Sequence, residues 1–203
     1  MKHLKASKIC ALGCGLLMLL SFVGCSTTTT EYGSKTTETT TVNKSADPKS
    51  TADAPSKFSG DNSGAQDLVN QFVQPNADHA ALTRQLKPTK EDYRAIFATE
   101  EMAAKAESTY AEVWNSPDAV IKPKPGQTSY KVTSVSTDNI KNGVGLDAFP
   151  GGYKDAGALF KPGLDLYKFD FLAPGEERGM AYDALVYVNG HWRFIPKPWR
   201  LAK

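Results

Sequence analysis

The residue of this chain with the clearest potential for chemistry is Asp183, because the surrounding pattern predicts a carboxylate on an apolar sheet face. Asn189 and Gly190 predict a two-residue hairpin turn between two strands. The register of such a turn places four apolar side chains on one face of the sheet: Leu185, Tyr187, Trp192 and Phe194. Asp183 has the same parity along its strand and is expected on that face.

A carboxylate in apolar surroundings must be hydrogen-bonded, ion-paired or protonated, which leaves two interpretations. In the first, Asp183 is the candidate catalytic residue of a pocket, and the four apolar side chains of the hairpin are candidate ligand-binding residues. In the second, Asp183 is structural and is held by a tyrosine, an arginine or main-chain amides, or lies near the open end of the sheet. The sequence leaves both open.

Other patterns that often mark reactive sites lack the context they need. Residues 143–148 (GVGLDA) fit a dinucleotide-binding loop, but Pro150 and two glycines follow where that loop requires a helix, so a flexible connection is expected. His79 and His191 have no spaced cysteine, histidine or acidic partners, and no metal site is predicted. A nucleophile elbow of the form G-x-S-x-G is also missing from the sequence. We therefore expect no metal and no cofactor.

The cysteines and the excess positive charge both belong to the start of the chain. Cys10, Cys14 and Cys25 are its only cysteines, so no disulfide is expected within the later residues. Three of the 24 basic residues precede Cys25, which leaves 21 basic against 22 acidic residues from there on. That balance gives no basic footprint for nucleic acid.

The first 24 residues have the pattern of an export signal. Residues 1–8 carry three lysines, and residues 9–24 form an uncharged stretch that is shorter than the ~20 apolar residues of a membrane-spanning helix. An uncleaved anchor and an ordinary secretory leader are the alternatives that this pattern leaves open.

The run Phe22-Val23-Gly24-Cys25 resembles the lipobox of bacterial lipoproteins. The resemblance implies that residues 1–24 are a signal peptide and that Cys25 becomes a lipid-modified N-terminus carrying fatty acyl chains such as palmitate. Two or more acyl chains anchor a protein stably in a membrane. By the same analogy Ser26 favours the outer membrane, facing the periplasm, in a Gram-negative cell.

Residues 25–61 are predicted to be a disordered tether, and residues 62–203 a folded domain. Positions 26–59 hold ten threonines and six serines, with few large apolar side chains to form a core. The domain begins with helical periodicity, in which Thr89 is predicted to cap one helix and Thr99 a longer one. Strand patterns follow over residues 130–135, 165–172, 180–188 and 191–195.

Helices followed by an antiparallel meander predict an α+β fold. The element order, the domain size and the terminal hairpin resemble the NTF2-like superfamily, the cystatin-like α+β cones. That resemblance implies N-terminal helices packed on a curved antiparallel sheet that encloses a pocket. Members include isomerases, dehydratases and pure binding modules, so the fold does not determine the function.

Three functional hypotheses remain. The first is a lipid-anchored cell-envelope protein whose domain binds a small hydrophobic ligand or an envelope protein without catalysis. The second is a small-molecule enzyme of isomerase or hydrolase type that uses Asp183. The third is a structural accessory that docks its sheet face on an envelope complex. No paired carboxylates and no histidine–aspartate set accompany Asp183, which favours binding over catalysis.

Overall fold

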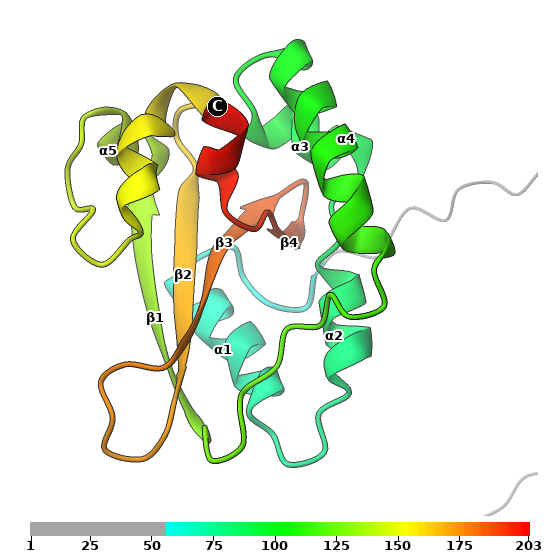
Figure 1. Cartoon of the computed structure of the whole chain (residues 1–203), viewed down its shortest axis with the longest axis vertical. Coiled ribbons are helices and arrows are strands. Elements are labelled where there is room, and N and C mark those ends of the chain that lie inside the picture. The colour runs from blue at the N-terminus through cyan, green and yellow to red at the C-terminus, as the bar shows by residue number, and fades with distance from the viewer. Residues whose placement is uncertain (1–55) are drawn as a thin grey trace, which may run out of the picture. The chain divides into compact units, whose positions relative to one another are not determined.

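The computed structural model describes residues 56–203, which form an α+β unit (Figure 1). The helices are α1 (Asn62–Phe72), α2 (His79–Gln85), α3 (Lys90–Ile96), α4 (Glu100–Asn115) and α5 (Thr137–Lys141). The strands are β1 (Ser129–Ser136), β2 (Asp165–Leu172), β3 (Met180–Val188) and β4 (His191–Phe194). Short 3-10 helices are η1 (Gly151–Asp155), η2 (Gly157–Leu159) and η3 (Pro198–Ala202). The sheet order is β1-β2-β3-β4 with antiparallel neighbours, so the predicted α+β class and meander are confirmed.

Side-chain caps explain where the helices begin. The cap that Thr89 is predicted to form at α3 is present as a capping box: the Thr89 hydroxyl accepts from the Asp92 N–H, and the Asp92 carboxylate accepts from the Thr89 N–H. Thr99 caps α4 in the predicted way through the Met102 N–H. The helix α5 is not predicted by sequence periodicity, because its five residues make little more than one turn.

The hairpin that joins β3 to β4 has the predicted turn. Asn189 and Gly190 both have positive φ, 52° and 80°, as a type I′ turn requires. Glycine reaches this conformation at no steric cost, and asparagine tolerates it better than most residues. The register of this hairpin is therefore fixed by two residues.

Both faces of the sheet are covered by helices, and each face has its own apolar core (Figure 1). On one face α1 packs against aromatic residues of β2, β3 and β4; we call this the α1 face. On the other face α3, α4, α5 and the 3-10 segments pack against smaller residues such as Val135, Ala184 and Val186; we call this the α4 face. The strand predicted over residues 165–172 is confirmed as β2, and its alternating aromatic residues Tyr167, Phe169 and Phe171 all belong to the α1 face.

The regular alternation of β3 is interrupted by one extra residue. Phe169 pairs with Tyr182, whereas Tyr167 pairs with Leu185, so β3 advances by three residues while β2 advances by two. Such a β-bulge reverses the face on which the following side chains lie. The interruption falls at Asp183 and Ala184.

The last residues of the predicted tether contact the folded unit. The Ser56 N–H donates to the Gly190 carbonyl at 2.9 Å, and the Trp192 indole N–H donates to the Ser59 carbonyl at 3.1 Å. Gly60 lies so close to Tyr187 that a Cβ there would come within 2.3 Å of the ring. The segment 56–61 thus reaches α1 along β4. The predicted signal peptide, Cys25 and residues 25–55 of the predicted tether lie outside the described residues.

Candidate functional site

The four apolar residues predicted from the hairpin lie on one sheet face, but they do not line one cavity. The register pairs Leu185 with Phe194 and Tyr187 with Trp192, as expected. All four belong to the core of the α1 face. Leu185 is fully buried, Phe194 borders one cavity, and Trp192 borders another. Only Phe194 therefore lies at the cavity that Asp183 lines.

Asp183 is not on the aromatic face, and the expectation from strand parity is wrong. The β-bulge in β3 supplies the extra residue, so counting in twos from Leu185 fails at this position. Its carboxylate instead accepts a hydrogen bond from the Tyr153 hydroxyl at 3.3 Å, and Tyr153 belongs to the core of the α4 face. A tyrosine partner is one of the structural arrangements that the sequence leaves open.

The surroundings of Asp183 stabilise the protonated form of its carboxyl group relative to the same group in water. Burial raises the pKa of its carboxyl to about 6, although the Tyr153 hydrogen bond and the charges of Lys168 and Lys197 oppose that rise. Burial also raises the pKa of Tyr153 well above its usual value, and the nearby Asp183 charge adds to that effect. The Tyr153 hydroxyl is therefore a donor across the physiological range, and Asp183 is its acceptor.

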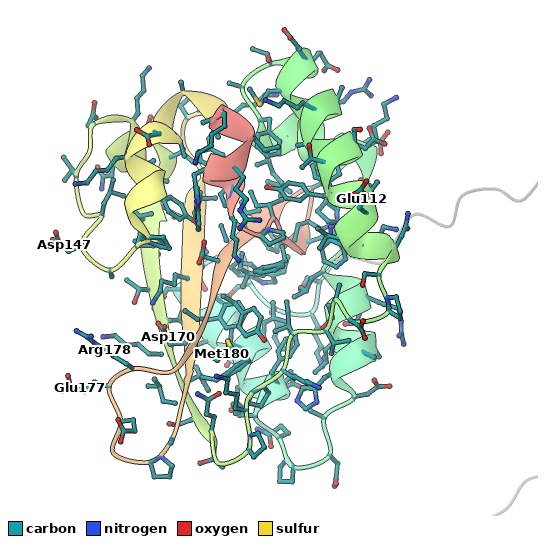
Figure 2. All side chains as sticks on the ribbon, viewed as in Figure 1. Glu112, Asp147, Asp170, Glu177, Arg178 and Met180 are labelled. Carbon is teal, nitrogen blue, oxygen red and sulfur yellow. The ribbon has the colours of Figure 1, made fainter. Side chains whose placement is uncertain are left out.

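Asp183 lines a cavity of about 320 Å³, which we call the Asp183 pocket. The pocket lies between the part of β3 that extends beyond the end of β4 and the segment that connects α4 to β1. Met180, labelled in Figure 2, is the first residue of β3 and lies at one end of this wall. Apolar and aromatic residues make most of the wall: Val113, Trp114, Ala119, Val120, Ile121, Met180, Ala181, Tyr182, Phe194 and Pro196. The charged residues at the pocket are Asp118, Asp183 and Lys197.

Hydrogen bonds hold the walls of the Asp183 pocket in place. The Tyr182 hydroxyl donates to the Lys122 carbonyl at 3.1 Å and accepts from the Lys122 N–H at 3.3 Å. The Thr83 hydroxyl accepts from the Ile121 N–H at 2.9 Å and donates to the His79 carbonyl at 2.7 Å. The crossing segment is thus tied to β3 on one side and to α2 on the other, so the pocket is formed before any ligand enters.

A buried hydroxyl close to this site has no hydrogen-bond partner among the described residues. It belongs to Tyr110 of α4, whose side chain is 4% exposed. Burial raises the pKa of Tyr110, and the charges of Tyr93 and Asp183 raise it further, which places Tyr110 within electrostatic reach of Asp183. Buried polar groups of this kind normally bind a protein group, an ordered water or a ligand.

A buried ion pair that the sequence pattern does not reveal connects α3 to β4. The Arg193 Nε donates to the Asp92 carboxylate at 2.6 Å, and the Asn189 amide donates to the same carboxylate at 2.8 Å. Burial alone raises the pKa of Asp92, but the Thr89 N–H, Asn189 and Arg193 together hold it below its usual value. Asp92 is predictable as a helix cap, whereas its pairing with a residue 101 positions away is not.

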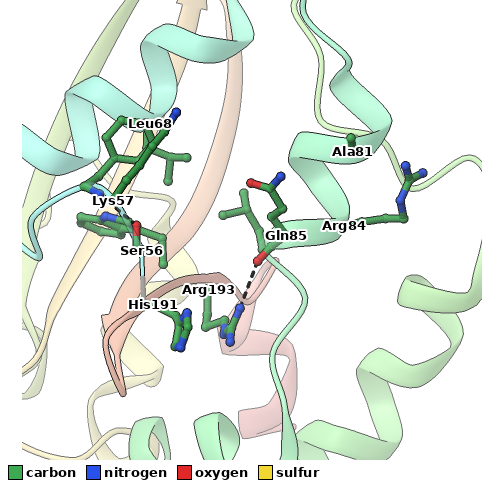
Figure 3. Close-up of a pocket in the computed structure, with 11 residues that line it drawn as sticks. Ser56, Lys57, Leu68, Ala81, Arg84, Gln85, His191 and Arg193 are labelled. Atoms are coloured by element: carbon green, nitrogen blue, oxygen red, sulfur yellow. Dashed lines mark hydrogen bonds between the residues drawn. The ribbon is translucent and has the colours of Figure 1, made fainter. Parts of the chain in front are cut away.

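A second and larger cavity, of about 710 Å³, runs along the outer side of β4 (Figure 3). Figure 3 shows Lys57 and Leu68 on one side of it and Gln85 on the other, with His191 and Arg193 between them. The Arg193 guanidinium donates to the Gln85 carbonyl at 3.0 Å, so this arginine braces the two sides. Trp192 also borders this larger cavity and does not line the Asp183 pocket.

The remaining candidates from the sequence are two histidines and residues 143–148. The His79 ring nitrogen lies 2.8 Å from the Phe72 carbonyl, and His191 is half-buried beside the hairpin turn. Within residues 56–203 no three histidine, cysteine or acidic side chains are grouped as a metal site would need. Residues 143–148 lie between α5 and η1, without the helix that a dinucleotide loop requires. In η3, Trp199 packs against Tyr153, the hydrogen-bond partner of Asp183, with ring centroids 5.2 Å apart.

No family model matches the chain, and comparisons with curated proteins and with solved structures found no match either. Over the described part of the chain, none of the helices combines the length and the apolar character that crossing a membrane would take.

Proposed function

We propose that this chain is a lipid-anchored cell-envelope protein whose domain binds a small, largely apolar molecule in the Asp183 pocket. The ligand carries a hydrogen-bond donor, preferably an amine, that contacts the Asp183 carboxylate. The observation that carries the proposal is the combination of a braced, mainly apolar cavity with a buried aspartate among its lining residues. Ligand pockets typically combine apolar walls with a few polar groups that orient the ligand.

The size and charge of the pocket define the ligand class. A cavity of about 320 Å³ is at the small end of the range for ligand sites, which suits a molecule of one or two rings. Two of its charged residues are acidic and one is basic, and Asp183 is ionised above about pH 6. A cationic amine therefore gains a charge-assisted hydrogen bond there, whereas an anion of the same shape is repelled.

A matched series of indoles tests this proposal. Tryptamine, tryptophol and indole-3-acetate have similar bodies and carry an ammonium, a hydroxyl and a carboxylate respectively. We expect titration calorimetry at about pH 7.5 to rank their affinities in that order for the full chain. Asp183→Asn should remove the advantage of tryptamine over tryptophol, about 10-fold for one charge-assisted hydrogen bond. Equal binding of all three, or an unchanged ranking in the variant, would refute the proposed role of Asp183.

One observation favours catalysis as a second candidate function. A carboxyl with a pKa of about 6 suits a general base or acid near neutral pH, and Asp183 has that value because it is buried. In this alternative, an isomerase or hydrolase acts on the same class of ligand, and Asp183→Asn abolishes turnover while the apolar part of the ligand still binds. We favour binding, because Tyr153 is the only titratable side chain among the described residues that is hydrogen-bonded to the Asp183 carboxylate.

The proposed location rests on the N-terminal sequence. The lysine-rich start, the short apolar run and Cys25 support lipid modification, and Ser26 supports the outer membrane. Cells that express the full chain or Cys25→Ala, labelled with a palmitate analogue, test the anchor. Label on the parent chain and none on the variant is the expected result, and equal labelling of the two would contradict it.

The NTF2-like assignment is part of the same proposal. Helices before an antiparallel meander, and a cavity between the end of α4 and the sheet, support it. The third hypothesis, a structural accessory that docks its sheet face on an envelope complex, is disfavoured for the aromatic face. That face cannot dock on another protein while α1 occupies it.

A further inference from the structure

The two edge strands of the sheet, β1 and β4, differ in the main-chain hydrogen bonds that they form with the rest of the described chain. At β4, the Ser56 N–H bonds to the Gly190 carbonyl and the Phe194 N–H bonds to the Leu86 carbonyl, both at 2.9 Å. These bonds cover both ends of that edge. At β1, within residues 56–203, no main-chain hydrogen bond reaches the side that faces away from β2. Figure 1 shows β1 at the margin of the sheet with no strand beyond it.

The ladder between β1 and β2 shows which groups lie on the open side. The Thr137 N–H donates to the Leu164 carbonyl, so these two residues form a hydrogen-bonded pair. In an antiparallel ladder, hydrogen-bonded pairs alternate with pairs that are not bonded, so every second residue before Thr137 also bonds to β2. The main chains of Lys131, Thr133 and Val135 therefore point toward β2. The N–H and carbonyl groups of Tyr130, Val132 and Ser134 point outward.

This edge lacks the features that usually prevent strands from pairing. β1 has eight residues in an uninterrupted register with β2, contains no proline, and has Lys131 as its single charged residue. Natural edge strands are commonly shortened, bulged, or protected by prolines and charges. A regular, nearly neutral strand whose outward main-chain groups meet no partner from residues 56–203 is instead suited to receive another strand.

We propose that the open edge of β1 pairs with β1 of a second copy of this chain. The two strands run antiparallel about a two-fold axis at Val132, so that the two sheets become one continuous sheet. Tyr130 then pairs with Ser134 of the second copy, and Val132 with Val132. Each of these pairs exchanges two main-chain hydrogen bonds, because all three residues present their groups outward.

The charge on β1 disfavours the register centred on Lys131. With the axis at Val132, Lys131 lies opposite Thr133, and the two lysines are not directly opposed. A shift that puts the axis at Lys131 would bring the two ammonium groups face to face in a close pair, which is unfavourable. Asp170, the register partner of Lys131 across the β1–β2 ladder, is itself ion-paired with Lys168 of its own strand, so Lys131 keeps its charge at the edge. A single charge of this kind allows self-pairing in registers that keep the two lysines apart, and the axis at Val132 is one in which Tyr130, Val132 and Ser134 all bond across the interface.

Proline at Ser134 tests the proposal with little change to the domain itself. The Ser134 side chain is exposed and its N–H points outward, so Ser134→Pro removes a donor from the proposed interface and none from the β1–β2 ladder. Sedimentation velocity of the full chain in a non-ionic detergent, across a range of protein concentrations, should show a monomer–dimer equilibrium. Ser134→Pro should weaken the dimer by about 10-fold or more, and Ser134→Ala should not.

Amide hydrogen exchange provides a second readout that does not depend on a variant folding. The outward amides of Tyr130, Val132 and Ser134 should be protected at high protein concentration and exchange rapidly on dilution. The inward amides of Lys131 and Thr133 should stay protected throughout, as the internal control. A chain that is monomeric at all concentrations overturns the proposal. Protection of the outward amides that is independent of concentration also overturns it, because another segment then covers the edge.

Discussion

Replacing Asp183 with asparagine should change how the stability of the domain depends on pH. In the parent chain the folded carboxyl has a pKa of about 6, whereas the unfolded value is near 3.8, so the folded state binds more protons between these values. The free energy of unfolding therefore falls as pH rises through this window. At 1.36 kcal/mol per pKa unit the full effect is about 3 kcal/mol, of which about 2 kcal/mol falls between pH ~4.5 and pH ~7.5.

The assay compares the melting temperatures of the full chain and Asp183→Asn across that pH range. For a domain of this size, about 2 kcal/mol corresponds to roughly 4–8 °C, so the variant should gain that much relative to the parent between the two pH values. Carboxylates with lowered pKa, such as Asp92, have the opposite pH dependence. They are common to both proteins and cancel in the difference. A constant difference across the range would refute the assignment of a raised pKa to Asp183.

Three further predictions follow from contacts of the same unit. Tyr153→Phe removes the hydroxyl that opposes the raised pKa, so calorimetry should find the pH-dependent loss of stability attributed to Asp183 displaced to higher pH; an unmoved profile would show that this hydrogen bond is unimportant. Gly152→Ala should lower the melting temperature, because its Cβ would lie 2.5 Å from an indole ring, whereas Gly151→Ala, with open space around it, should not. Asp92→Asn removes the carboxylate from a buried ion pair and should cost about 3–5 kcal/mol in chemical denaturation, and a cost below about 1 kcal/mol would contradict that value.

Local chemistry explains what the sequence predicts correctly. The hairpin register depends on Asn189 and Gly190 alone, and the start of α3 depends on Thr89 with Asp92 three residues later. The alternation of aromatic residues in β2 likewise reports which face they occupy. Each of these features is decided by residues within a few positions of one another.

The features that sequence reasoning misses depend on distant parts of the chain. The bulge at Asp183 arises from how β3 pairs with β2, and the residue types at that point do not predict it. The partner of Asp92 is Arg193, which the fold brings to the cap of α3 from β4. The walls of the Asp183 pocket come from α2, the end of α4, the segment before β1, strand β3, and the end of β4 with the residues that follow it. The pocket therefore exists only after these elements have packed.

The central claim is that a small apolar ligand occupies the Asp183 pocket, and the most direct measurement locates a bound probe. Nuclear Overhauser effects between the ring protons of tryptamine and the methyl groups of the full chain give that location. We predict contacts to Val113 and Ile121, which line the pocket. Contacts to Leu68 of α1, which lines the larger cavity along β4, would contradict the account. The absence of any contacts at a tryptamine concentration that saturates binding would also contradict it.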